Sequence, residues 1–233
     1  MTEQEIKQII DCVVDRYINA VGGNGGSSVD CTKSDCSSAA CSNKDGSVMI
    51  EASARHVHLT KEAVEKLFGA GEKLNPVRPL SQPGQFLSDK RVKLVTNKGV
   101  IDNVAVLGPE RSKIQVELSL TDSRQLGLKP PIKMSGDLDG AGDVYIFSEK
   151  SMIEAKSSVI VAKAHIHMRP EDAECYGVSD NQHVKVRVDS ERPVIFDDVV
   201  IRVDKNFAPA MHVDFDEANA CCLSKSAKAY ILK

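Results

Sequence analysis

The sequence lacks the features that mark a membrane protein or a secreted one. No apolar run reaches the roughly 18 residues that a membrane-spanning helix needs. The first residues also lack the basic-then-apolar order of a secretory signal. We therefore expect a cytoplasmic protein that has no membrane partner.

An excess of charge of either sign is also missing. The 30 Lys and Arg residues nearly balance the 33 Asp and Glu residues, which gives a net charge of −3. The basic residues are spread along the chain, so it lacks the basic stripe of a nucleic-acid-binding protein. With 42% hydrophobic and 27% charged residues, the 233-residue chain has the composition of a globular protein with one sizeable core or two smaller ones.

No C-x-x-C pair occurs among the seven cysteines. Cys31, Cys36 and Cys41 recur every five residues, but they stand among Ser, Gly and Asn residues. A metal cluster at this spacing is disfavoured, because short motifs without structural context rarely hold. We interpret residues 23–46 as a flexible linker, and the role of these three cysteines stays open.

An amphipathic pattern precedes this linker. Within residues 1–22, apolar side chains follow the i, i+3, i+4, i+7 spacing of a helix, and charged residues occupy the other face. We predict a helix that docks its apolar stripe on a partner protein. Folding back on its own domain and self-association are the alternatives. Membrane binding is disfavoured because the polar face is acidic rather than rich in Lys and Arg.

From Ser47 onward the sequence favours β-structure. Short β-branched runs recur between turn residues, and we predict strands at 92–96, 100–107, 114–120, 144–147, 184–188, 194–203 and 229–232. Brief helices are predicted at 60–68, 121–127, 170–177 and 216–220. Nothing resembles the alternation of strands with long helices, so the many short strands indicate a mainly β fold of small barrels.

The most informative motif is present twice. His56-Val57-His58 and His165-Ile166-His167 each end an apolar run, at Val48–Val57 and Val159–Ile166, which we predict to be extended strands. Residues i and i+2 of a strand share a face, so each copy can chelate one ion at the usual zinc distance of about 2.0–2.1 Å. Because the residues after each copy also match, the sequence predicts two related domains, each with a histidine strand followed by a short helix.

Three further residues carry side chains that can bind a metal, and His183 is excluded from the site. His212 ends another apolar stretch and is a candidate fifth ligand. His183 lies in a polar turn, and we interpret it as a surface residue. Glu117 lies between Val116 and Leu118, so alternation places its carboxylate opposite the apolar side chains, and we favour a solvent-facing position for it.

Several segments together carry a resemblance to a known family. They are Ala54–Thr60, Ser81–Phe86, Val106–Arg111, Val116–Ser119, Ser135–Leu138, Ala164–Met168 and His212–Ala220. These segments closely resemble the PduL-type phosphotransacylases, which are phosphate propanoyltransferases of bacterial microcompartments. The resemblance covers about Ser47 to the C-terminus and is far more specific than any single motif.

This resemblance implies a fold and a site. The implied fold has two small β-barrel domains capped by short helices, one made of residues 47–54 plus 163–233 and the other of residues 55–162. A dinuclear zinc site would lie between them, and its implied ligands are His56, His58 and Glu117 for one ion and His165, His167 and His212 for the other. At Glu117 the role of ligand implied by the resemblance replaces the solvent-facing position that alternation favours. Arg111 matches the phosphate-contacting arginine of the family, and a planar guanidinium suits that task.

The resemblance also implies an activity, which is the exchange of acyl-CoA plus phosphate for acyl-phosphate plus CoA. We assign the CoA sulfur to the zinc of His56, His58 and Glu117, and phosphate to the other zinc with Arg111. Residues 1–22 look like an encapsulation peptide, so we expect them to bind shell proteins and to place the enzyme inside a bacterial microcompartment. We also expect a homo-oligomer, a dimer or larger.

Two other classes of function remain. A dinuclear zinc hydrolase could use the same six ligands to activate water. A non-catalytic scaffold would use the histidines structurally and the N-terminal helix to associate with a shell. No motif encodes whether acetyl, propanoyl or longer acyl groups are preferred.

Overall fold

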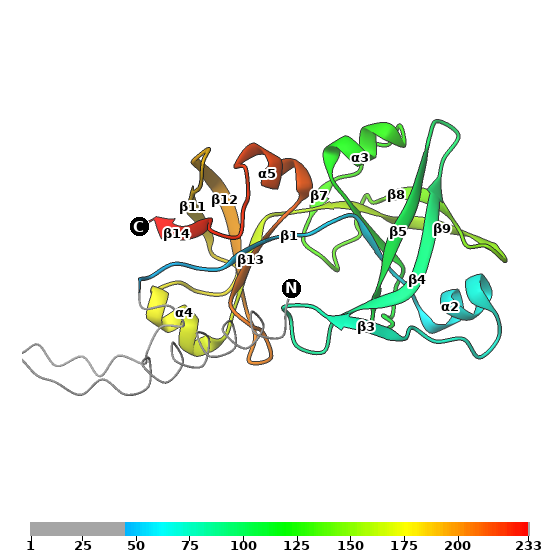
Figure 1. Ribbon diagram of the computed structural model, residues 1–233, viewed down its shortest axis with the longest axis horizontal. Helices are drawn as coiled ribbons and strands as arrows, with labels where there is room; N and C mark the ends of the chain where they lie inside the picture. The colour runs from blue at the N-terminus through cyan, green and yellow to red at the C-terminus, as the bar shows by residue number, and fades with distance from the viewer. Residues whose placement is uncertain (1–44, 233) are drawn as a thin grey trace, which may run out of the picture. The chain divides into compact units, whose positions relative to one another are not determined.

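Residues 45–232 are described by the computed structural model of the chain (Figure 1). The predicted amphipathic helix at 1–22 lies outside the described residues. The predicted linker at 23–46 also lies outside them, except for residues 45 and 46.

One barrel is built on a six-stranded sheet in the order β1-β13-β10-β12-β11-β14 (Figure 1). A single bridge between Val48 and Ala229, which belongs to β14, joins the two ends of this sheet. The strands of this first barrel are β1 (Ile50–Ala52), β10 (His165–Met168), β11 (His183–Asp189), β12 (Val194–Val203), β13 (Ala210–Val213) and β14 (Lys228–Leu232).

The second barrel is built on an eight-stranded sheet, in which β8 pairs with both β4 and β9. This double pairing closes a ring of β4, β5, β2, β6, β9 and β8, while β3 and β7 lie at the sides. The strands are β2 (His56–His58), β3 (Pro76–Pro79), β4 (Phe86–Val95), β5 (Val100–Gly108), β6 (Gln115–Leu118), β7 (Ile132–Lys133), β8 (Gly142–Phe147) and β9 (Met152–Ala162). The prediction of a mainly β fold with two small barrels is confirmed.

Both predicted histidine strands are interrupted where the chain passes from one barrel to the other. The run at Val48–Val57 divides into β1 and β2, because β1 pairs with β13 whereas β2 pairs with β5 and β6. The run at Val159–Ile166 divides in the same way into β9 and β10. Apolar content alone predicted one strand in each run and did not reveal the change of sheet.

The strands around each histidine pair repeat in arrangement and in register. β2 lies between β5, which is parallel to it, and β6, which is antiparallel. β10 lies in the same way between parallel β12 and antiparallel β13. His56 is thereby paired with Glu117, and His165 with His212. The predicted relation between the two halves of the chain is thus present in the backbone itself.

A short helix follows each of the strands β2, β6, β10 and β13. The helices are α2 (Lys61–Phe68), α3 (Leu120–Gln125), α4 (Pro170–Tyr176) and α5 (Phe215–Ala220). Thr60, Ser119 and Asp214 begin α2, α3 and α5, and each side chain accepts a hydrogen bond from a backbone N–H in the first turn. Within residues 45–232, no helix has the length and apolar content to cross a membrane.

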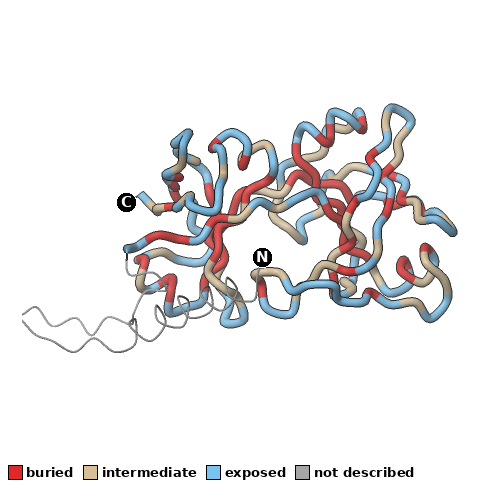
Figure 2. Tube along the Cα trace, in the orientation of Figure 1, coloured by how far each residue is buried: buried red, intermediate tan, exposed pale blue. Residues whose placement is uncertain are grey.

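Successive side chains of β2 and β10 point alternately into a barrel core and into the space between the barrels. Val57 and Ile166 are 0% exposed and lie in the two separate cores, where each contributes about 1.5–3 kcal/mol by burial. The histidines on either side of them point to the opposite face. Outer strands such as β11 alternate between buried and exposed positions, whereas every residue of β2, β6 and β10 is buried (Figure 2). The second face of these strands is therefore covered as well.

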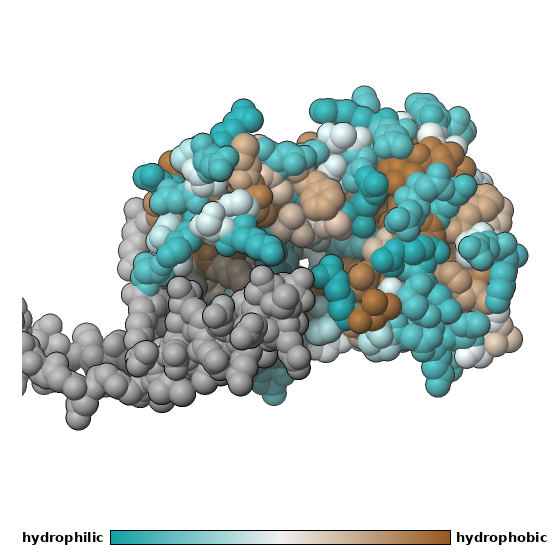
Figure 3. Space-filling view, in the orientation of Figure 1, coloured by the Kyte–Doolittle hydropathy of each residue, from teal (hydrophilic) through white to brown (hydrophobic). Residues whose placement is uncertain are grey.

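Apolar side chains outside the cores are scattered. On the face drawn in Figure 3, hydrophobic residues stand in patches between hydrophilic ones. The most exposed large hydrophobic residues of the described chain are Val77, Ile195 and Ile132, which come from three different strands.

Polar contacts join the barrels at Gln82 and at Asp216. The buried Gln82, between β3 and β4, donates from Nε2 to the carbonyl of Ala208 (2.9 Å) and accepts at Oε1 from its N–H (3.2 Å). Asp216 on α5 accepts from the backbone N–H of Thr121 on α3 (2.8 Å). Because Gln82 uses both ends of its amide on one residue, it holds the β12–β13 connection against the second barrel.

We expect Gln82→Ala to lower the free energy of unfolding by about 1–3 kcal/mol, because the N–H and carbonyl of Ala208 lose their partner. Urea denaturation measures the change. Ser81→Ala is the matched control, since the Ser81 side chain makes no hydrogen bond within the described residues. Equal stability of the two variants would contradict the role given to Gln82.

Candidate functional site

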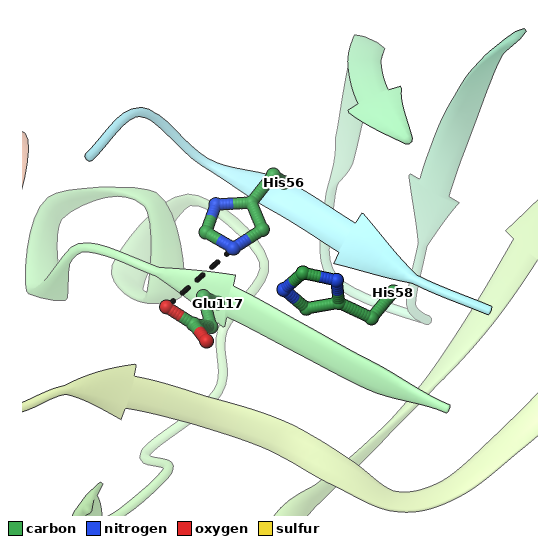
Figure 4. Close-up of side chains that lie close together, drawn as sticks. All are labelled: His56, His58 and Glu117. Carbon is green, nitrogen blue, oxygen red and sulfur yellow. Dashed lines mark ion pairs between the residues drawn. The ribbon is translucent and has the colours of Figure 1, made fainter. Parts of the chain in front are cut away.

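Three predicted metal ligands come together on the outer face of the second barrel. The ligand atoms of His56, His58 and Glu117 all lie within 4.8 Å of one another. His56 Nε2 is 3.5 Å from Glu117 Oε2, and the two side chains point toward each other from β2 and β6 (Figure 4). The three residues are only 3–8% exposed, so this is an enclosed group of ligands rather than a surface cluster.

The other three predicted ligands gather on the outer face of the first barrel. The ring centroids of His165 and His167 are 4.7 Å apart, and the His212 ring lies 5.3 Å from the first and 4.9 Å from the second. His165 and His167 are buried, and His212 is partly exposed. His183, interpreted from the sequence as a surface residue, is exposed and pairs with Asp198 instead.

The first histidine of each pair is oriented by the backbone. Nδ1 of His56 lies 2.7 Å from the Ala54 carbonyl, and Nδ1 of His165 lies 2.8 Å from the Lys163 carbonyl. A carbonyl only accepts hydrogen bonds, so Nδ1 carries the proton and the lone pair remains on Nε2. Histidine ligands of metals are commonly fixed by such a hydrogen bond.

The second histidine of each pair leaves a buried nitrogen without a partner. Within the described residues, Nδ1 of His58 and Nδ1 of His167 are the buried side-chain atoms that make no hydrogen bond. Leaving a buried polar group unpaired costs about 1–3 kcal/mol. Two histidines and a carboxylate, or three histidines, are ligand sets that zinc accepts, and the unpaired nitrogens fit that ion.

The protonation of the histidines also suits metal binding. Burial lowers the pKa of His58 and of His165 below the ordinary value. Burial together with neighbouring rings lowers the pKa of His167 to about 2, and burial with the nearby His165 lowers that of His212 to about 3. These imidazoles are therefore neutral at pH 7, and neutral imidazole is the form that binds a metal.

Glu117 is ionised in spite of its burial. Burial raises the pKa of Glu117, but His56, Ser135 and Arg111 lower it by more, so the net shift is downward. Gln115 holds the carboxylate through a 2.6 Å bond from Nε2 to Oε1. The solvent-facing position favoured by alternation is wrong: the side chain does point away from the core, but that face is covered by the first barrel.

Arg111 reaches the same site from the connection between β5 and β6. Its backbone N–H donates to the Leu59 carbonyl (2.8 Å), and Nη1 donates to the Ser135 hydroxyl (3.2 Å). The pKa of Arg111 is lowered, chiefly by burial and also by the nearby Arg202, and Glu117 opposes this shift only in part. The guanidinium stays charged, as arginine does in proteins. A fixed cation thus stands beside the first group of ligands.

A cavity of about 800 Å³ unites these residues. It is lined by the six predicted ligands and Arg111, with residues of both barrels in its wall. Gln82 also lines it, and Gln82 Nε2 lies 3.5 Å from Nε2 of His212. Sequence reasoning gave Gln82, Gln115 and Ser135 no role. The signal at Gln115 is that it shares a strand face with Glu117 two residues later. The signal at Gln82 and Ser135 is that both lie in segments that resemble the family.

Comparisons with known proteins show the family of the chain. Residues 49–224 match the profile of the family described as phosphate propanoyltransferase. A phosphate propanoyltransferase of Alkaliphilus metalliredigens is 42% identical over the full length of both chains. One from Enterococcus faecalis is 50% identical over 79% of this chain and 87% of its own, and one from Leptotrichia buccalis is 53% identical over 76% of this chain and 84% of its own. The chain therefore belongs to the phosphate propanoyltransferase family.

Proposed function

We propose that this phosphate acyltransferase interconverts a short-chain acyl-CoA, such as propanoyl-CoA or acetyl-CoA, plus phosphate with acyl-phosphate plus CoA at a site that holds two zinc ions. The observation that carries the proposal is the pair of histidine groups in one cavity, each completed by a third ligand on a neighbouring strand. Family membership supports the transfer of an acyl group to phosphate.

We assign one ion to each group. His56, His58 and Glu117 would hold the first zinc, and His165, His167 and His212 the second. When bound, the first zinc would stabilise the thiolate of CoA, and the second would offset negative charge on phosphate and on the carbonyl oxygen.

Arg111 is the residue that we assign to phosphate. The Ser135 hydroxyl accepts from one end of its guanidinium, and Gln115 donates to that hydroxyl from Nε2 (2.8 Å). These two hydrogen bonds fix the plane of the guanidinium, and its remaining N–H groups can bind two phosphate oxygens at once. Holding phosphate in one orientation beside the thioester carbonyl lowers the entropic part of the barrier.

Hydrolysis is the reaction that this site must avoid. The ligand sets would also serve a hydrolase that activates water. Release of CoA from propanoyl-CoA, followed with and without phosphate, separates the two functions. Release that depends on phosphate and yields propanoyl-phosphate supports the transferase, and equal release without phosphate supports the hydrolase. Repeating the assay with acyl chains of increasing length defines the preferred acyl group.

We expect about two zinc ions per chain in the purified protein. Glu117→Gln and His212→Ala should each lower the content toward one, because each removes a ligand from a different group. Elemental analysis after gel filtration measures the content, and chelation should abolish the exchange reaction. His183→Ala serves as the control, since its exposed ring lies outside both groups. A folded parent protein with fewer than one zinc per chain would favour the scaffold.

We expect Arg111→Ala to raise the KM for phosphate roughly tenfold or more, because charge-assisted hydrogen bonds are worth about 1.5–3 kcal/mol and 1.4 kcal/mol is a factor of ten. The KM for acyl-CoA should change far less. Steady-state kinetics with each substrate varied in turn gives both values, and Arg124→Ala on the exposed side of α3 is the control. Equal effects on both substrates would refute the assignment.

We propose in addition that residues 1–22 bind shell proteins and place the enzyme inside a bacterial microcompartment. The support is the helical spacing of apolar residues in this segment, together with the Gly- and Ser-rich residues that separate it from the barrels.

Deletion of residues 1–22 should abolish packaging and leave the exchange activity in solution largely intact, because the segment precedes all the predicted ligands. Co-purification of full-length and truncated enzyme with assembled shells measures packaging. Substitution of apolar positions in the segment by Ser, with its length kept, is the matched variant. Normal packaging of the truncated enzyme would rule out this role.

A further inference from the structure

One buried amide of the second barrel reaches across to the group of His165, His167 and His212 on the first barrel. Gln82 is 3% exposed, lines the cavity and places its Nε2 3.5 Å from Nε2 of His212. Its bonds to Ala208 hold the two barrels together, but they do not use the whole side chain. Nε2 carries two hydrogens, and the Ala208 carbonyl accepts only one of them. The second N–H faces the ligands.

The backbone around Gln82 is a tight turn that supports the side chain. The N–H of Gln85 donates to the Gln82 carbonyl (3.1 Å), and Pro83 and Gly84 occupy the two positions between them. The φ of Gly84 is +77°, which is close to the value that a type II turn requires there, and proline fixes φ at the position before it. Gln82 therefore presents its amide from a rigid part of the chain.

The orientation of the amide is set by Ala208. Oε1 accepts from the backbone N–H of Ala208 (3.2 Å), and Nε2 donates to its carbonyl (2.9 Å). A flipped amide would place oxygen against oxygen and N–H against N–H, so the NH2 group rather than the oxygen faces His212. Because an N–H only donates, this contact requires the lone pair of His212 to be on Nε2.

The second N–H of Gln82 has no good acceptor in the described part of the chain. Its 3.5 Å contact with His212 is longer than an ordinary hydrogen bond. An imidazole nitrogen has a single lone pair, and in the proposed function we assign that of His212 Nε2 to the ion. The contact is then lost, and burial makes an unpaired N–H costly. An oxygen of the substrate, bound beside His212, would supply the missing acceptor.

Two kinds of substrate oxygen meet in this cavity under the proposed function. The phosphate oxygens carry negative charge before the reaction, and Arg111 is the cation that we assign to them. The thioester carbonyl oxygen is neutral at first and gains negative charge as phosphate attacks. Hydrogen bonds to charged groups are stronger than those between neutral groups, so a neutral amide N–H stabilises the transition state more than the substrate. This difference favours the carbonyl oxygen as the partner of Gln82.

We propose that Gln82 is a catalytic residue whose second N–H stabilises the negative charge that develops on the carbonyl oxygen of the acyl group. The inference rests on the proposed function, because it takes acyl transfer to phosphate as the reaction. An oxygen of hydrogen phosphate forms a bond to the carbonyl carbon, and an electron pair of the C=O bond moves to the oxygen. When the carbonyl re-forms, the C–S bond breaks, and the sulfur leaves as a thiolate that takes up the proton of the phosphate. Because Ala208 fixes the amide before substrate binds, no reorientation is needed.

Gln82→Met tests this role in the full-length chain, because methionine has a similar length and no N–H. We expect kcat for phosphate-dependent transfer from propanoyl-CoA to fall roughly 10²–10³-fold, the usual loss when one oxyanion-hole donor is removed. The KM values for both substrates should change far less, since the interaction strengthens in the transition state. Asp216→Ala is the matched control and should keep the kcat of the parent. It removes the bond to Thr121 that also joins the barrels, and Asp216 is not among the residues that line the cavity.

A spectroscopic measurement detects the hydrogen bond without turnover. Propanoyl-dethia-CoA, in which a methylene group replaces the sulfur, cannot transfer its acyl group, and an isotopic label on its carbonyl identifies the infrared band. We expect the band to lie at a lower wavenumber on the parent and on Asp216→Ala than on Gln82→Met, because a hydrogen bond weakens the C=O bond. If the parent shows this difference but no phosphate-dependent transfer, the proposed function fails and the hydrogen bond stands.

Elemental analysis and urea denaturation accompany each variant, to measure zinc content and folding. Gln82→Glu keeps an acceptor for the Ala208 N–H but has no N–H of its own, so it takes the place of Gln82→Met if that variant does not fold. We expect the same fall in kcat and the same change of the carbonyl band.

Other results overturn the inference. A rise in the KM for phosphate with kcat unchanged would place the N–H on phosphate instead. An unchanged kcat, or an equal loss of kcat in Asp216→Ala, would leave Gln82 as a contact between the barrels only. A loss of kcat that follows a loss of zinc, with the carbonyl band unchanged, would mean that Gln82 acts by holding His212 and does not touch the substrate.

Discussion

The site depends above all on the register of the two histidine strands with their antiparallel neighbours. Pairing of His56 with Glu117 and of His165 with His212 places a third ligand beside each histidine pair. A slip of one residue in either ladder would turn that ligand into the core and bring an apolar side chain to the site. Val57 and Ile166 oppose such a slip, because each fills a core position that no histidine could occupy without burying an unpaired polar ring.

The same register explains why two barrels are needed. Each histidine group lies on the outside of its own barrel, where a single barrel would leave it in water. The other barrel covers it, and the Gln82 amide fixes that cover through both of its hydrogen bonds to Ala208. Burial keeps the imidazoles neutral, but it also leaves Nδ1 of His58 and of His167 without a partner. A bound cation would relieve this cost, which links metal binding to the docking of the barrels.

Local sequence signals predicted much of this arrangement. The β-branched runs, the brief helices and the doubled histidine motif correspond to elements of the structure, and the resemblance of several segments to one family agrees with the family profile. Alternation correctly separated Glu117 from the core, but it could not tell what covers the other face. The breaks near Ser53 and Lys163 were missed for a related reason. A chain that leaves one sheet for another keeps its extended backbone, so its composition does not change at the crossing.

The repeat is exact in register but unequal in chemistry, and this inequality supports a division of tasks. Beside the second histidine of each pair, the parallel neighbour supplies Leu107 in the second barrel and Arg202 in the first. The residue paired with His58 is therefore apolar and would suit a thioester and its arm, whereas the residue paired with His167 is a cation and would suit phosphate. Arg111, from the β5–β6 connection of the second barrel, adds a further cation, and it stands beside Glu117 in the first group. Two copies of one strand arrangement thus give their ligands unlike neighbours, because the residues at equivalent positions differ while the backbone pairing is the same.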